Sequence, residues 1–154
     1  MTTEFRIQTA NASHIDVIAD FNCRLALETE DLVLNRETVR EGVRRGLELQ
    51  PEVQYFLVLA AEAVVGQIMV TREWSDWRNG WIWWLQSLYV SADFRRQGIF
   101  RLLLNHVKSA ALAHSAACIR LYVERDNKSA IEAYHRQKFR DAGYQVMELA
   151  VADF

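Results

Sequence analysis

The sequence is poor in the residues that cross-link or interrupt small proteins. Its 154 residues include two cysteines, one proline and six glycines. Cys23 and Cys118 are far apart and form no CxxC motif, which argues against a disulfide framework or a zinc site and favours two reduced thiols. Without a linker, repeat or low-complexity tract to divide it, the chain is expected to form a single domain over residues 1–154.

Long apolar runs and a large excess of one charge are also missing. No stretch is long enough to span a membrane, and the N-terminal MTTEFRIQTA lacks the apolar core of a signal peptide. We therefore expect a cytoplasmic protein with no membrane partner. A net charge of −2 and a pI of about 6.1 argue against nucleic acid as a partner. The four histidines show no metal-ligand spacing, so no metal site is expected.

Hydrophobic periodicity predicts ten secondary-structure elements. Asn11 or Ser13 is expected to cap the first helix, and Ser129 with Glu132 to form a capping box on the last. The expected strands are 5–10, 54–60, 64–74, 81–90, 118–124 and 143–151, and the expected helices are 13–28, 36–49, 99–114 and 127–137.

The connections between these elements predict the sheet. A three-residue link at 61–63 and the Asn79-Gly80 turn predict an antiparallel meander of the second to fourth strands. The β-α-β unit over 81–124 predicts a parallel pair. The order β-α-α-β-β-β-α-β-α-β indicates an α/β protein with a mixed, mostly antiparallel sheet and helices on both faces.

The turn over 93–101 carries an unusual concentration of positive charge. Three arginines stand against one aspartate around Gly98, at the expected start of a helix, where the helix dipole disfavours cations. A bound anion would accept the unpaired amides of the helix end and offset the misplaced charge. A solvated loop with extended arginines is the competing interpretation. The glycine spacing fits neither a P-loop nor a dinucleotide-binding fingerprint.

Two motifs carry a resemblance to a known family. The run from Arg95 to Phe100 resembles the pyrophosphate loop Arg/Gln-x-x-Gly-x-Gly/Ala of the GCN5-related N-acetyltransferases (GNAT), with Phe100 replacing the last small residue. Asn127, Ala130, Tyr134 and Phe139 resemble the family signature Asn-x-x-Ala-x-x-x-Tyr-x-x-x-Gly-Phe, with Lys138 replacing the glycine. The order of elements is similar over nearly the whole chain. The resemblance implies an acyl-CoA N-acyltransferase-like fold that uses acetyl-CoA.

The resemblance also implies roles for particular residues. Asn127 would hydrogen-bond the pantetheine region, and Tyr134 would lie near the thioester sulfur as the general acid. Backbone groups of three strand residues would pair with the pantetheine arm, and the turn would hold the pyrophosphate. The strand residues are Leu88, Tyr89 and Val90, and the turn residues are Arg95, Arg96, Gln97, Gly98, Ile99, Phe100 and Arg101.

The general base and the acceptor site are less well indicated. Relatives often carry a glutamate on the fourth strand, but 81–90 contains no carboxylate. Glu28 and Glu30 at the end of the first helix, and Glu73 and Asp76 beside the fourth strand, are candidates to bind the acceptor amine. Of these, Glu28 and Glu73 are the leading candidates for catalysis.

All five tryptophans lie within 73–84. On a strand, Trp81 and Trp83 share one face while Trp84 takes the other. Trp83 could form a wall of the acceptor pocket and hold a cationic amine by cation–π contact. Packing in the core is the competing interpretation, and an exposed tryptophan could instead mark a homodimer interface.

These features predict an enzyme. We expect an acetyl-CoA-dependent N-acetyltransferase that moves an acetyl group to a primary amine of a small molecule by direct attack on the thioester. The alternative is a non-catalytic acyl-CoA-binding or metabolite-sensing module of the same fold. The sequence leaves open which amine is the acceptor and whether the chain forms a dimer.

Overall fold

The computed structural model describes residues 2–153. Its contacts divide the chain into two compact parts, one ending at Tyr122 and the other beginning at Val123, and each is described by itself. The prediction that residues 1–154 form a single domain stays a prediction. No helix within residues 2–153 has the length and apolar character needed to cross a membrane.

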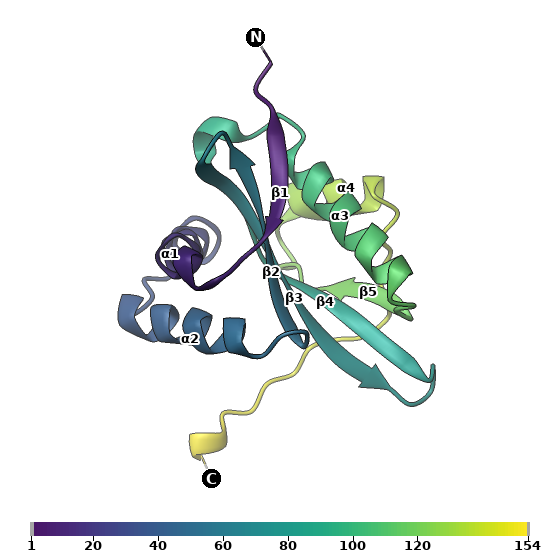
Figure 1. Cartoon of the computed structure of the whole chain (residues 1–154). Coiled ribbons are helices and arrows are strands. Elements are labelled where there is room, and N and C mark those ends of the chain that lie inside the picture. The colour runs from purple at the N-terminus through teal and green to yellow at the C-terminus, as the bar shows by residue number, and fades with distance from the viewer. Residues whose placement is uncertain (1, 154) are drawn as a thin grey trace. The chain divides into compact units, whose positions relative to one another are not determined.

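The first part is built on a five-stranded sheet with the strands in chain order (Figure 1). Its first three pairs are antiparallel, and β4 and β5 are parallel, so the predicted meander and the predicted parallel pair are both confirmed. The strands are β1 (Phe5–Thr9), β2 (Val53–Ala60), β3 (Ala63–Ser75), β4 (Gly80–Val90) and β5 (Cys118–Leu121).

Three helices of the first part cover the two faces of this sheet. Helices α1 (Ile15–Glu30) and α2 (Arg36–Glu48) lie on one face, and α3 (Ile99–Ala113) lies on the other (Figure 1). Asn11 caps the 3₁₀ turn Ala12–His14 that leads into α1, because its side chain accepts from the Ser13 N–H at 2.9 Å. The predicted fold class, a mixed and mostly antiparallel sheet with helices on both faces, is confirmed.

Strand alternation divides the core between the two faces. Ile18 of α1 and Val43 of α2 pack against Tyr55 and Leu57 of β2. The opposite face holds Trp83, which is 1% exposed. Since adjacent strand residues point to opposite faces, Trp83 and its neighbour Trp84 are separated by the sheet itself.

One extra residue in β4 interrupts this alternation. Gln67 of β3 lies opposite Tyr89 and Met69 lies opposite Gln86, so Ser87 and Leu88 together face one residue of β3. Ser87 has a φ of 51°, a left-handed conformation that suits a β-bulge. Beyond the bulge, Tyr89 points to the α1 face, where its ring lies 5.0 Å from that of Phe21.

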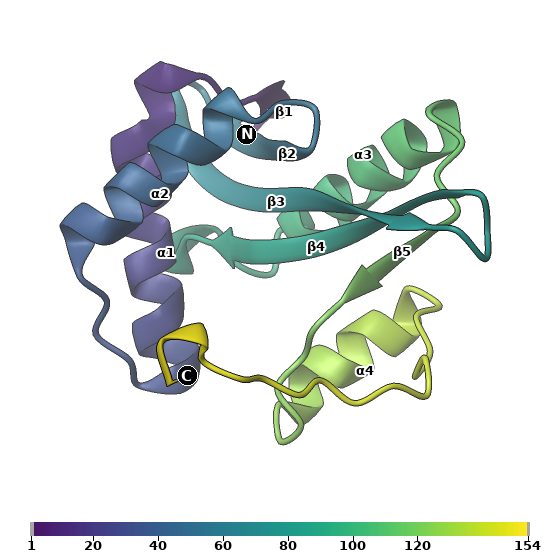
Figure 2. The same cartoon turned by 90° about the horizontal axis from the view of Figure 1, so that it is seen from below.

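β4 extends well beyond its parallel partner (Figure 2). The ladder between them ends at the pair Leu85 and Leu121, whereas β4 runs on to Val90. Within the described chain, the β5-facing edge of residues 86–90 therefore has no strand beside it. The Ser91 N–H bonds the Val65 carbonyl of β3. Because the backbone groups of successive strand residues point to opposite edges, the N–H and carbonyl of Val90 point to the open edge.

The second part contains α4 (Lys128–Arg136). Its cap is Asn127, whose Oδ1 accepts from the Ala130 N–H at 3.2 Å, so the predicted Ser129 and Glu132 capping box is wrong. After the helix, Lys138 takes a left-handed φ of 69°, and the Phe139 N–H bonds the Tyr134 carbonyl. This is the turn where the family signature has glycine, the residue that adopts such a φ most easily.

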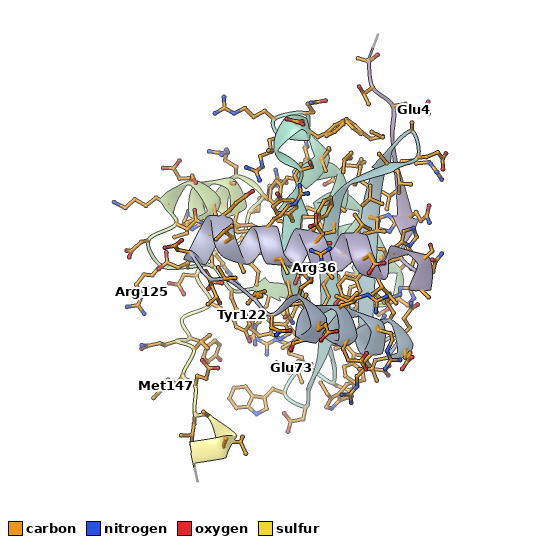
Figure 3. All side chains as sticks on the ribbon, turned by 90° about the vertical axis from the view of Figure 1, so that its left-hand side faces the viewer. Glu4, Arg36, Glu73, Tyr122, Arg125 and Met147 are labelled. Carbon is orange, nitrogen blue, oxygen red and sulfur yellow. The ribbon has the colours of Figure 1, made fainter. Side chains whose placement is uncertain are left out.

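The predicted last strand, 143–151, is wrong. Residues 144–150 form no ladder with any described segment, and a short 3₁₀ turn follows at Val151–Asp153. The alternating apolar pattern is real, but its side chains are exposed, including Met147 at 90% (Figure 3). A strand needs a hydrogen-bonding neighbour, and sequence propensity alone does not supply one.

Replacing Gly66 by alanine should destabilise the protein. The new methyl group would lie 2.8 Å from Ile99 Cγ2, and Ile99 is buried where α3 begins. We expect a loss of about 1–3 kcal/mol in the free energy of unfolding, because a packed core resists added volume. Denaturant unfolding measures this loss.

The matched control for that substitution is Gly42→Ala. Gly42 lies inside α2, and a methyl group added there would meet no atom within 4 Å beyond the helix's own backbone. Alanine is the better helix former, so this variant should gain roughly 0.5–1 kcal/mol. Equal stabilities for the two variants would contradict the packing assigned to Gly66.

Candidate active site

The arginine turn leads directly from β4 into α3. Gly98 caps the helix in a left-handed conformation, with a φ of 84°, and Arg96 is also left-handed at 62°. The helix has no side-chain cap and no acidic residue in its first turn. Its first intrahelical bond runs from the Leu102 N–H to the Gly98 carbonyl, so the helix end presents its opening amides outward. This is the geometry of an anion site.

The three predicted arginines differ in where they lie relative to the start of α3. Arg96 and Arg101 are exposed around it. Arg95 instead turns back toward the sheet, where its Nε donates to the Val90 carbonyl at 3.0 Å and its guanidinium lies 5.5 Å from the Tyr89 ring. Ile99 takes the fully buried position at the start of α3, and Phe100 beside it is half-buried.

Glu28 joins the end of α1 to this turn. Its Oε2 accepts from Arg95 Nη2 at 2.6 Å, and its Oε1 accepts from the Tyr89 hydroxyl at 3.0 Å. Burial, followed by the bond to Glu28, raises the pKa of Tyr89. Both carboxylate oxygens of Glu28 are therefore engaged in holding β4, the turn and α1 together.

A pocket of about 270 Å³ opens between the first two helices and the bulge of β4. The α1 residues supply an amide and a carboxylate, the bulge supplies Ser87, and the remaining walls are apolar. Glu30 is the one predicted acceptor residue in it. The lining residues are Asn22, Leu25, Ala26, Glu30, Leu34, Val39 and Ser87.

Two polar residues at this pocket were not predicted from the sequence. Gln67 is fully buried beneath it and donates to Asn22 Oδ1 at 2.7 Å and to the Ser87 carbonyl at 3.1 Å. A glutamine within the apolar run VVGQIMV was the available signal, because a buried amide needs partners. Nothing in the sequence distinguished Asn22 from the other polar residues of the amphipathic helix 13–28.

Glu73 lies elsewhere on the sheet (Figure 3), and Asp76 lies in the turn that follows β3. Glu73 is opposite Ile82, about 17 Å along the strand from Ser87 at 3.3 Å per residue. Its Oε2 lies 3.7 Å from Arg120 Nη1. Asp76 is exposed in the β3–β4 turn, where its carbonyl accepts from the Asn79 N–H. The four predicted carboxylates are thus not brought into one cluster.

Trp83 lies on the α3 face, away from the pocket. Its ring is 5.8 Å from His114, and the guanidinium of Arg72 lies 4.6 Å from its centre. The tryptophan on the α1 and α2 face is Trp84, which stacks against Tyr122 with ring centres 4.6 Å apart. Core packing therefore accounts for Trp83.

The predicted residues of the second part have local contacts of their own. Asn127 caps α4, as described above, and the Tyr134 ring packs edge-on against Phe139 at 5.6 Å. Burial raises the pKa of the Tyr134 hydroxyl. Among the described residues no cluster of histidine, cysteine or carboxylate could hold a metal ion.

These features recur in known proteins. The model of the acetyltransferase (GNAT) family matches residues 21–139, which include the bulge, the arginine turn and Tyr134. The chain belongs to the GNAT family. Members of this family use acetyl-CoA, and the acyltransferase fold expected from the sequence is confirmed. A search of curated proteins found no match.

Solved structures agree with the assignment. A possible acetyltransferase from Clostridium difficile 630 is 37% identical, with 96% of this chain and 97% of that one covered and a TM-score of 0.90. A probable acetyltransferase is 26% identical, with 95% and 97% covered and a TM-score of 0.82. A predicted acetyltransferase from Clostridium acetobutylicum, solved with acetyl-CoA, shares the fold at 13% identity, 98% and 99% coverage and a TM-score of 0.79.

The turn of this GNAT protein fits the pyrophosphate of acetyl-CoA. A side chain at Gly98 would meet no atom within 4 Å, so the space in front of the helix end is open. Amide donors, exposed arginines and a glycine that permits close approach form a suitable donor set for phosphate oxygens.

Replacing Gly98 by alanine should weaken acetyl-CoA binding by about tenfold or more. A left-handed alanine is strained by about 1–2 kcal/mol, and relaxation of that strain would turn the helix-end amides away. Isothermal titration calorimetry with acetyl-CoA measures the change.

Gly143→Ala is the control, because Gly143 has a similar φ of 78° and equally open surroundings. It introduces the same strain outside the turn and should leave the affinity unchanged. Equal losses of affinity in the two variants would contradict a phosphate site at Gly98.

Proposed function

We propose that this protein transfers the acetyl group of acetyl-CoA to a primary amine of a small molecule by direct attack on the thioester. The amine loses a proton through a pocket carboxylate to water, its nitrogen bonds the thioester carbon, and the carbon–sulfur bond breaks to release CoA. The observation that carries the proposal is the continuity of β4, whose open edge over 86–90 leads straight into the anion-binding turn at Gly98. One strand end thus offers backbone groups for an extended arm and a helix terminus for its phosphates.

The chain's own groups would divide the work of binding acetyl-CoA, which supplies the activated acetyl group. Backbone groups of Leu88, Tyr89 and Val90 would pair with the pantetheine arm along the open edge. The turn from Arg95 to Arg101 would hold the pyrophosphate through its amides, with Arg96 and Arg101 attracting the charge. A backbone N–H near the bulge would donate to the thioester oxygen as negative charge develops there.

The pocket beside Ser87 is the proposed acceptor site. It adjoins the bulge, so an amine bound there would approach the open edge of β4. Glu30 would attract and orient the amine, while Glu28 would act as a positioning residue through Arg95 and Tyr89. Glu73 is engaged with Arg120 and lies far along the strand, which favours a role for Glu30 over Glu73.

Tyr134 is the proposed proton donor to the departing thiolate, and Asn127 is proposed to bind the pantetheine region. Both proposals rest on the family signature. A protonated hydroxyl is the form that a general acid requires.

The second candidate is a non-catalytic acyl-CoA-binding module. The specific observation in its favour is that β4 carries no carboxylate in 81–90. Either function fits a cytoplasmic protein that binds small molecules rather than nucleic acid. A homodimer is compatible with both.

Release of CoA across a panel of primary amines distinguishes the two candidates. We expect turnover with at least one small amine, and Tyr134→Phe should lower that turnover by about 100-fold or more while acetyl-CoA still binds. Tyr144→Phe makes the same change at an exposed tyrosine outside the proposed site and is the control. Tight acetyl-CoA binding without turnover of any amine would favour the non-catalytic module.

Glu30→Gln should raise the KM for the acceptor amine by about three- to fivefold, because an exposed ion pair contributes up to about 1 kcal/mol and Glu30 is the only charged group among the described lining residues. Glu73→Gln is the matched control and should leave KM within about twofold. Steady-state kinetics at saturating acetyl-CoA measures both values. A larger effect from Glu73 than from Glu30 would place the acceptor near the hairpin instead.

A further inference from the structure

We propose that Asn22 presents its side-chain N–H to the acceptor pocket, so that the acceptor carries a neutral hydrogen-bond-accepting oxygen in addition to its amine. This inference rests on the proposed function, because it assigns the chemistry of the same pocket. It is carried by the buried amide of Gln67, which orients Asn22.

The orientation of Gln67 follows from its contact with the backbone of the bulge. The Ser87 carbonyl lies 3.1 Å from one terminal atom of the glutamine side chain. A carbonyl oxygen only accepts hydrogen bonds, so that terminal atom must be the nitrogen, Nε2. The opposite assignment would set two acceptors against each other in a site with no exposure to water.

The same nitrogen then fixes the orientation of Asn22. Gln67 Nε2 lies 2.7 Å from a terminal atom of the Asn22 side chain. An amide nitrogen does not accept, so the atom of Asn22 facing Gln67 must be Oδ1. With Oδ1 held from below, the group that Asn22 can offer to the pocket is its Nδ2, which is a donor.

Burying the side chain of Gln67 lowers the stability of the fold, and packing alone does not explain why a glutamine is present. Its Oε1 is buried without a hydrogen-bond partner among the described residues. An unpaired buried carbonyl destabilises a fold, and a leucine or methionine would avoid the penalty. The amide does hold the carbonyl of the left-handed Ser87 and the oxygen of Asn22, which are both at the pocket wall. Gln67 is therefore a positioning residue for the pocket.

The rest of the pocket wall defines the kind of oxygen that fits. Among the described residues that line it, Glu30 is the only charged one, and none is a lysine or an arginine. A carboxylate on the acceptor would meet this negative charge without a cation to offset it. Leu25, Leu34 and Val39 provide apolar walls. The acceptor class is therefore an apolar amine bearing an ether, hydroxyl or amide oxygen, rather than an amino acid with a free carboxylate.

The test compares two amines of the same shape with wild-type protein and Asn22→Asp. One is the methyl ether of leucinol, and the other has a CH₂ group in place of the ether oxygen. The aspartate retains the oxygen that Gln67 holds but replaces the donor by an acceptor. The ratio of kcat/KM for ether over hydrocarbon should fall at least about fivefold in Asn22→Asp, and comparing ratios cancels the different basicities of the two amines.

Asn105→Asp, the same change at an exposed position on α3, is the control and should leave the ratio unchanged. Leucine, which carries a carboxylate, should be the poorest substrate of wild-type protein. An equal ratio in wild-type protein and Asn22→Asp, or a preference for leucine, would overturn the inference.

A second measurement needs no variant. Wild-type protein labelled with nitrogen-15 asparagine and saturated with CoA is titrated with each amine. The Nδ2 resonance of Asn22 should shift with the ether and not with the hydrocarbon, and an unchanged resonance with the ether overturns the inference.

The two proposals fail in different ways. Turnover without any preference for oxygen overturns only the assignment of Asn22. Preferential binding of the ether without turnover of any amine overturns the proposed acetyl transfer and retains the Asn22 donor. Amines that neither react nor bind overturn both.

Discussion

The bulge in β4 is the constraint on which the rest of the site depends. One extra residue at Ser87 and Leu88 changes which side chains face the first two helices, so that Gln86 before the bulge and Tyr89 after it share a face. Tyr89 thereby reaches Glu28. The left-handed Ser87 is strained, and strain of this kind persists where surrounding contacts impose it. Here the β3–β4 ladder on both sides of the bulge and the bond from the buried Gln67 amide to the Ser87 carbonyl are those contacts.

Helix α1 connects the two halves of the proposed site. Its middle turn contributes Asn22 to the pocket. Its last turns contribute Glu28, which accepts a hydrogen bond from Arg95, and Glu30, which lines the pocket. Because these residues belong to one rigid helix packed on the sheet, the pocket and the anion-binding turn have a common support. A shift of α1 would therefore alter both sites together.

Local signals in the sequence were sufficient for much of the fold. Gly98 marked the helix end, and Asn79-Gly80 marked the hairpin. The strand predicted over 143–151 failed because alternation describes which side chains could share a face, whereas a ladder requires a neighbour. The capping prediction failed at Ser129 because α4 begins earlier, with Asn127 as its cap, so that Ser129 lies inside the helix.

The sequence by itself determined the order of elements through β5 and α4, the glycine turn at the start of α3 and the family. These depend on periodicity and short spacing, which are properties of neighbouring residues. The tertiary structure decided which carboxylate lines the pocket, that Trp83 is core, and that Gln67 orients Asn22. These features depend on contacts between residues far apart in the chain, such as Glu28 and Arg95. Such contacts depend on strand register and on a single bulge. Strand register depends on the hydrophobic pattern and turn geometry of several segments together, so no single residue reveals it.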